Sequence, residues 1–194
     1  MQWFKQIALM VVACVLAGGA MAQVNVSGVK YDESIDVRGS KLQLNGAGVR
    51  YRGPFKVYTA GMYLSRKAQT PEEALAAPGA KRISITMLRE IDSNELGKLF
   101  SRAMEDNMDK AAFSKLVPGV MRMSQIFFDH KKLVAGDSFL IEWIPGAGTV
   151  ITIKGQPQGE PFKEPEFYNA MMRIWLGPNP ADWKLKDALL GKPA

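Results

Sequence analysis

The stretch NGAGVRYRGPFKVYTAGMYL, residues 45–64, carries the strongest indication of the fold. Residues 55–64 and residues 49–52 are rich in β-branched and aromatic residues, so both segments are predicted to be strands. The glycine-rich run at residues 45–48 predicts a break before them. The stretch therefore indicates two successive strands that follow a glycine-rich connection.

The segments on either side extend this pattern into a mixed fold. Alternating apolar residues predict a hairpin over residues 35–44, a strand over 81–88 and a second hairpin over 137–153. Capping residues and apolar stripes of helical period predict helices that begin at Thr70 and Asp92. Further helices are expected over residues 120–128, 166–176 and 182–190, the last ending at Gly191. Strands and helices that segregate in this way predict an α+β fold, a large antiparallel sheet with a layer of helices on one face.

The N-terminus has the order of features that marks a cleaved signal peptide. Lys5 is followed by an apolar run over residues 7–16, which is shorter than the about 20 residues that a membrane-spanning helix needs. Ala20-Met21-Ala22 predicts the cleavage site, so residues 1–22 are expected to be the signal peptide and residues 23–194 a periplasmic or secreted domain without a membrane segment. Cys14 loosely fits a lipoprotein cleavage box, and lipidation there stays open as the alternative.

Composition narrows the classes of partner. Cleavage after Ala22 removes the single cysteine, so neither a disulfide nor a thiolate site is expected. The formal net charge falls from +6 to +5 because Lys5 is lost. Lys and Arg are scattered along the chain, which argues against nucleic acid as a partner. We expect a monomeric domain, and its positive charge leaves open an attraction to small anions or to an anionic membrane face.

Few residues can support catalysis or metal binding. His130 is the only histidine, and it lies in the charged segment Asp129-His130-Lys131-Lys132, without a third group to orient it. No HExxH, CxxC, GxSxG or P-loop pattern occurs. Residues 46 and 48 do not make a dinucleotide fingerprint. The sequence therefore predicts no metal, no cofactor and no catalytic residue.

Arginine and tyrosine side chains on the two central strands remain as candidates for binding an anion. Arg50 and Arg52 share a face of their strand because side chains alternate with period two, and Tyr58 and Tyr63 lie on the next strand. A guanidinium can bind a carboxylate or phenolate through two hydrogen bonds, and a tyrosine hydroxyl can add a third.

Residues 45–50, followed by residues 55–64, resemble the chalcone isomerase superfamily, whose plant members carry a glycine-rich run into an arginine and then a strand ending in Gly-x-Tyr-Leu. Residues 167–177 and Leu189-Leu190-Gly191 are similar to the closing helices of the bacterial, secreted branch of that superfamily. The resemblance covers about residues 35–191. It implies an open-faced β-sandwich, in which a large antiparallel sheet carries a layer of helices over one face.

The resemblance also implies roles for individual residues. The arginine that holds the substrate phenolate in the isomerases matches Arg50. Either Tyr58 or Thr59 matches the next polar position, and Tyr58 is favoured because fatty-acid-binding relatives use an Arg-Tyr pair. The helix that carries the catalytic tyrosine and asparagine has Leu96 and Phe100 or Ala103 near those positions. Lys98 is the only polar residue there and is one position off, so the catalytic set is mostly missing.

Three functional hypotheses follow. The first is a non-catalytic periplasmic binding protein for a small amphipathic carboxylate or phenolic ligand, such as a fatty or aromatic acid, with Arg50, Tyr58, Thr59 and Lys98 as candidate ligand-binding residues. The second is an isomerase or intramolecular lyase acting on an enone or phenolic substrate, with Arg50 as the electrophile. The third is a protein-binding domain that uses an exposed patch around Trp175 and Trp183. In the first, an adaptable apolar cavity is expected to be lined by methionines: Met62, Met87, Met104, Met108, Met121 and Met171.

Overall fold

The computed structural model describes residues 22–192, so the predicted signal peptide, its cleavage motif and Cys14 lie outside the described residues, apart from Ala22. A seven-stranded antiparallel sheet forms the centre of the molecule, in the order β11-β10-β9-β6-β5-β4-β3. Its strands are β3 (Ser34–Val37), β4 (Ser40–Arg52), β5 (Phe55–Leu64), β6 (Lys81–Met87), β9 (Ser138–Ile144), β10 (Gly148–Ile153) and β11 (Gln156–Pro157).

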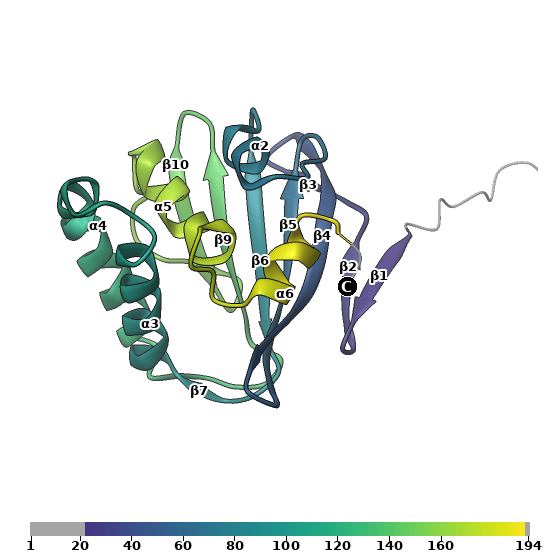
Figure 1. Cartoon of the computed structure of the whole chain (residues 1–194), viewed down its shortest axis with the longest axis horizontal. Helices are drawn as coiled ribbons and strands as arrows, with labels where there is room; N and C mark the ends of the chain where they lie inside the picture. Colours follow the sequence, from purple (N-terminus) through teal and green to yellow (C-terminus); the bar gives the residue numbers. More distant parts are fainter. Residues whose placement is uncertain (1–21, 193–194) are drawn as a thin grey trace, which may run out of the picture.

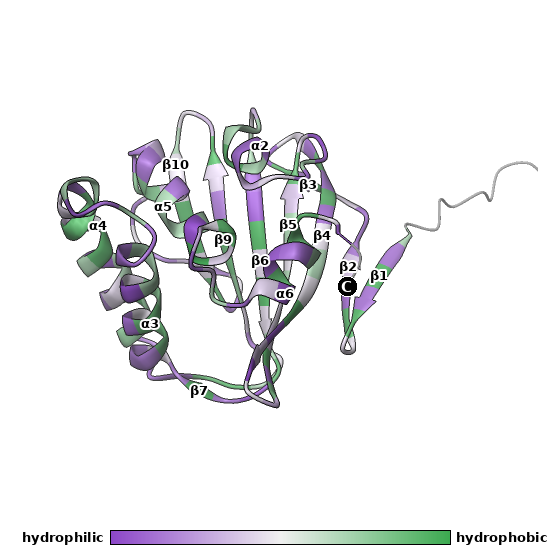
Figure 2. Cartoon of the chain, viewed as in Figure 1, coloured by the Kyte–Doolittle hydropathy of each residue, from purple (hydrophilic) through white to green (hydrophobic). Residues whose placement is uncertain are grey.

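The helices lie over one face of this sheet (Figure 1). They are α2 (Pro71–Ala76), α3 (Ser93–Glu105), α4 (Lys110–Phe128), α5 (Pro165–Leu176) and α6 (Trp183–Leu189). Bands of apolar and polar residues alternate along β6 (Figure 2), because every second side chain is buried against this helical layer. The predicted α+β architecture, an open-faced sandwich, is confirmed.

The glycine-rich run at residues 45–48 lies inside a strand, so the predicted break is wrong. β4 continues from Ser40 to Arg52, with a shift of register between Leu44 and Gly46. A Cβ atom on Gly46 would lie 2.0 Å from the carbonyl oxygen of Ala188, and one on Gly48 would lie 2.6 Å from the Ala188 Cβ. The glycines are there because the end of α6 packs directly on the β4 backbone.

Helix α4 is longer than predicted. It begins after Asp109, whose side chain accepts a hydrogen bond from the Ala112 N–H at 2.8 Å, and it continues through Pro118. Proline inside a helix costs about 3 kcal/mol. The helix is nevertheless stabilised by its buried face, which holds Leu116, Val120, Met123 and Phe127. The predicted caps of the other two helices are present: Thr70 and Glu73 form a capping box on α2, and Asp92 caps α3.

The N-terminal hairpin covers part of the opposite face of the sheet and was not predicted. It consists of β1 (Gln23–Val26) and β2 (Val29–Asp32), and Tyr31 packs against Gly61 of β5. The Tyr31 hydroxyl donates a hydrogen bond to Thr59 Oγ1 at 2.8 Å. A separate short pair, β7 (Ile91–Asp92) and β8 (Lys132–Leu133), joins the two ends of the α3–α4 helical unit.

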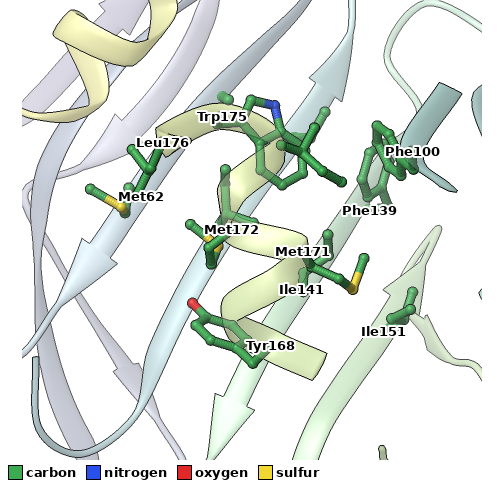
Figure 3. Close-up of a cluster of buried hydrophobic side chains, with 14 of the residues drawn as sticks. Met62, Phe100, Phe139, Ile141, Ile151, Tyr168, Met171, Met172, Trp175 and Leu176 are labelled. Atoms are coloured by element: carbon green, nitrogen blue, oxygen red, sulfur yellow. The ribbon is translucent and has the colours of Figure 1, made fainter. Parts of the chain in front are cut away.

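The core between the helices and the sheet is built largely by α5, which directs Tyr168, Met172 and Trp175 toward the strands (Figure 3). Trp175 is fully buried, so the predicted exposed patch around Trp175 and Trp183 is wrong; of the two, only Trp183 is exposed. Most of the methionines also fill the core, whereas Met121 is 67% exposed. Within residues 22–192, no helix is long and apolar enough to cross a membrane.

Candidate functional site

A cavity of about 220 Å³ lies between one end of the sheet and helix α3. β4 and β5 form its floor, α3 forms one wall, and the end of α5 with the loop before α6 closes it. The lining is mainly apolar, with polar side chains at a few positions: Arg50, Val57, Tyr58, Ile91, Leu96, Leu99, Phe100, Arg102, Ala103, Asp106, Ile174, Asn179, Pro180 and Ala181.

Arg50 and Tyr58 are direct cross-strand partners on this floor. The Arg50 Cζ atom lies 5.6 Å from the centroid of the Tyr58 ring. Among the described residues, no carboxylate oxygen lies within 4.0 Å of an Arg50 nitrogen, and the half-buried guanidinium makes no hydrogen bond to the protein. Its positive charge therefore faces a mainly apolar cavity without a protein counter-ion in this part of the chain.

Tyr58 is held by Trp175. The side chain of Tyr58 is 1% exposed, and its hydroxyl oxygen accepts a hydrogen bond from Trp175 Nε1 at 2.8 Å. Burial raises the pKa of Tyr58 to about 12, although the charge of Arg50 and the Trp175 hydrogen bond act in the opposite direction. The hydroxyl is therefore protonated at neutral pH. Its hydrogen has no acceptor among residues 22–192, so it can be donated to a ligand.

Asp182 lies close enough for its charge to raise the pKa of Tyr58 further, but its oxygens are already occupied. Oδ1 accepts hydrogen bonds from the N–H groups of Lys184 and Leu185 and so caps α6. Oδ2 accepts a hydrogen bond from the Tyr51 N–H at 2.8 Å. Asp182 thus fastens the start of α6 to β4 instead of neutralising Arg50.

The rim at the end of α3 is fixed by two asparagines. The buried Asn107 accepts a hydrogen bond from the Asn179 N–H at 2.8 Å and donates one to the Asn179 carbonyl oxygen at 2.9 Å. Asn179 in turn donates to the Asp106 carbonyl oxygen at 3.0 Å. These bonds hold the loop before α6 over the cavity.

The predicted ligand-binding residues are only partly brought together. Arg50 and Tyr58 line the cavity, whereas Thr59 lies on the opposite face of the sheet and bonds to Tyr31. Lys98 is exposed on α3 and does not line the cavity, because its position on the helix turns it away from Leu96, Leu99 and Phe100.

Two of the other candidates from the sequence also lie elsewhere. Tyr63 belongs to the apolar cluster beneath the N-terminal hairpin. Arg52 lines a neighbouring hollow, beyond a register shift between Arg50 and Tyr51 after which Arg52 pairs with Phe55.

The sequence missed Trp175 and Asp182 as parts of the site. Trp175 follows Met171 by four residues on the apolar stripe of α5, which places both on one face of the helix. The stripe therefore predicts that Trp175 is buried, but its bond to Tyr58 joins segments 117 residues apart. The local sequence around Asp182 indicates only that this residue caps a helix.

No metal site is present in the part of the chain that the structure describes, since no three His, Cys, Asp or Glu side chains gather there. His130 Nε2 lies 2.9 Å from Gln158 Oε1, away from the cavity. The side of the cavity formed by α3 carries Leu96, Phe100 and Ala103. The floor of the site can thus offer the Arg50 cation and the Tyr58 hydroxyl donor beside an apolar wall, with Arg102 and Asp106 also among the lining residues.

Comparisons with known proteins agree with this architecture. The family model described as chalcone isomerase-like matches residues 23–191. The crystal structure of a fatty-acid binding protein from Arabidopsis thaliana is similar, with a TM-score of 0.70 and 17% sequence identity. The similarity covers 87% of this chain and 96% of the plant chain. The comparison with curated proteins found no match.

Proposed function

The chain belongs to the chalcone isomerase-like family, and from that premise we propose that it is a non-catalytic periplasmic protein that binds a small amphipathic organic anion. The ligand is a fatty or aromatic acid. Its carboxylate lies against Arg50 and Tyr58, and its apolar part lies along α3. The plant neighbour is a fatty-acid binding protein, which supports binding over catalysis.

The observation that carries this proposal is the unpaired charge of Arg50 at an apolar cavity. A guanidinium that is partly removed from water loses some of its hydrogen bonds to water, so the site favours an anion that restores the lost interactions. A carboxylate satisfies this need best, because it accepts two parallel hydrogen bonds from one guanidinium. The rest of the ligand must then be apolar to match the wall formed by Leu96, Leu99 and Phe100.

Tyr58 adds a second, directional contact. Its oxygen is used by Trp175, so its free hydrogen favours a head group that only accepts hydrogen bonds. An ionised carboxylate meets that requirement, whereas an ammonium group would place a second positive charge beside Arg50. Arg50 and Tyr58 together thus select an anion by charge and by hydrogen-bond polarity.

The same geometry argues against the isomerase alternative. A general base works best with a pKa near the operating pH, and the pKa of Tyr58 is about 12. The wall where the family's catalytic side chains are expected carries Leu96, Phe100 and Ala103, none of which can stabilise a developing oxyanion. We therefore expect negligible cyclisation of chalcones, and turnover near that of a plant isomerase would overturn the binding proposal.

Titration calorimetry with octanoate tests the binding site. The mature protein should bind octanoate, and Arg50→Ala should weaken binding by about 2 to 5 kcal/mol, the usual cost of removing one partner of a buried charge pair. Without ligand, the same variant should keep or increase its thermal stability, because an unpaired charge is removed. Arg52→Ala is the matched control and should bind as the wild type does. Wild-type affinity in Arg50→Ala would refute the site.

The location is tested separately. We propose that residues 1–22 are removed after export and that the mature chain begins at Gln23. The intact mass of protein recovered from the periplasmic fraction measures this directly. A diacylglyceryl group on Cys14 would overturn both the cleavage site and the soluble location.

A further inference from the structure

The cavity is closed on the side of the aromatic core. Phe100 packs edge-on against Trp175, with ring centroids 5.5 Å apart, and edge-on against Phe127 at 5.4 Å. The ring centroids of Phe100 and Phe139 lie 5.9 Å apart. Figure 3 shows these two side chains next to each other. These rings are buried, and protein interiors are close-packed. Phe100 therefore closes the cavity on the side of the core, and a tail directed inward from Arg50 meets its ring as a wall.

Charged groups limit the cavity on its outer sides. On one rim, Arg102 Nε and Asp106 Oδ2 lie 3.8 Å apart on the exposed face of α3. On the other, the cavity shares Val57 and Ile91 with a neighbouring hollow of about 630 Å³. Five of the ten residues that line that outer hollow are charged (Arg52, Arg89, Glu90, Asp92 and Glu95), and the others include Phe55 and Pro54. A long apolar tail that left the cavity would lie against charges and water.

The size of the cavity sets the length of the tail. Its 220 Å³ is smaller than the about 300 Å³ at which pockets for drug-sized ligands begin. A long-chain fatty acid exceeds this space, whereas a short-chain or single-ring acid fits it.

We infer that this site selects short monocarboxylates, of about six to eight carbons or of a single aromatic ring, and that Phe100 sets the upper limit. This inference rests on the proposed binding function and adds the ligand class and the residue that determines it. Arg50 and Tyr58 fix the carboxylate, and Phe100 fixes how far the tail can extend.

A series of linear monocarboxylates from four to sixteen carbons, with benzoate, tests the inference by titration calorimetry on the mature protein. Affinity should rise about fourfold with each methylene, which corresponds to about 0.8 kcal/mol of buried CH₂. The rise should stop near eight carbons, and dodecanoate and longer acids should bind at least tenfold more weakly than octanoate. Affinity that continues to rise up to sixteen carbons would overturn the length limit and leave the binding function intact. Absence of binding at every length would instead overturn the binding function itself.

Two variants test the role of Phe100. Phe100→Ala should move the best ligand to longer chains and raise dodecanoate affinity at least tenfold relative to octanoate. Phe167→Ala is the matched control, because Phe167 is equally buried but stacks on Phe162 outside the cavity, and its length profile should be that of the wild type. If Phe100→Ala does not fold, Leu99→Ala can be used instead, because Leu99 is half-buried and lines the same wall. It should shift the preferred chain length in the same direction by a smaller amount. An unchanged profile in the folded variants would refute Phe100 as the limit.

Discussion

The hydrogen bond from Trp175 to Tyr58 can be tested without any ligand, by replacing each residue with phenylalanine. Tyr58→Phe removes the acceptor and leaves the indole N–H buried and unpaired, since Trp175 is 0% exposed. An unsatisfied buried donor costs about 1 to 3 kcal/mol, so the free energy of unfolding should fall by that amount. Trp175→Phe removes the donor instead and leaves a small cavity beside Phe100, with a loss of about 1 to 2 kcal/mol.

The double variant distinguishes a real bond from mere packing. With Tyr58→Phe already present, Trp175→Phe also removes the unpaired N–H, so the combined loss should be smaller than the sum by about 1 to 2 kcal/mol. Urea denaturation of the four proteins, followed by circular dichroism, gives the four free energies. Tyr51→Phe, at an exposed position of β4, is the matched control, and its loss of stability should simply add to that of Trp175→Phe. Additivity of the two buried substitutions within about 0.3 kcal/mol would refute the bond.

Three further predictions address pH, packing and the two faces of the sheet. Because the pKa of Tyr58 is raised from 10.0 to about 12, the unfolded state loses this proton first, so the free energy of unfolding should fall between pH 10 and 12, by about 3 kcal/mol from Tyr58 alone. In denaturation curves measured over this pH range, Tyr58→Phe should reduce the fall. The same pH dependence in the variant and the wild type would contradict the raised pKa of Tyr58. Gly46→Ala should lower the free energy of unfolding by about 1 to 3 kcal/mol, because the added Cβ presses α6 away from β4. Gly97→Ala on α3 is the control: its Cβ would lie 3.4 Å from the nearest atom, so it should be neutral or stabilising by up to about 1 kcal/mol. Equal losses of stability in thermal melts of the two variants would argue against the close contact at Gly46. Thr59→Val should destabilise the protein by about 1 kcal/mol through Tyr31 and leave octanoate affinity unchanged; a loss of affinity would place Thr59 in the site.

Local sequence patterns predicted most of the elements because those elements are determined by neighbouring residues. Thr70 and Asp92 mark helix starts through bonds to N–H groups three residues away. Alternation predicted β6 and β9 because about every second residue is buried, whereas all six residues of β10 are buried. The missed N-terminal hairpin also had a local signal, since Ser27-Gly28 forms a two-residue connection with positive φ at both positions, 50° and 88°.

The glycine-rich run could not be interpreted from local sequence. Glycine next to a strand usually indicates a turn or a bulge, and that meaning predicted a break at residues 45–48. The actual reason is a contact with the C-terminal part of the chain: the Asn45 side chain bonds to the carbonyl oxygen of Leu189, 144 residues away, and Gly46 and Gly48 leave space for α6. A contact over that distance has no signature in either segment alone.

The candidate site shows the same division between local and distant information. Arg50 and Tyr58 could be predicted because they are adjacent on strands that follow one another in the chain, and alternation directs Tyr58 and Thr59 to opposite faces. Lys98 is one position away from the helix position that the resemblance implies, and one residue along a helix rotates a side chain by about 100°. Trp175 could be predicted as a buried residue but not as the partner of Tyr58, because that requires the packing of α5 on β5.

The unpaired charge of Arg50 is itself a consequence of how α6 is held. Asp182 is an acid whose charge reaches Tyr58, and a carboxylate in that position would be expected to pair with the neighbouring guanidinium. Its oxygens instead cap α6 and bind the Tyr51 N–H, and the close packing of Ala188 on Gly46 and Gly48 fixes the helix in that position. Moving Asp182 to Arg50 would leave the first N–H groups of α6 without acceptors, which costs about 0.5 to 2 kcal/mol for a lost cap. The packing of the last helix thus leaves the positive charge of Arg50 available to a ligand.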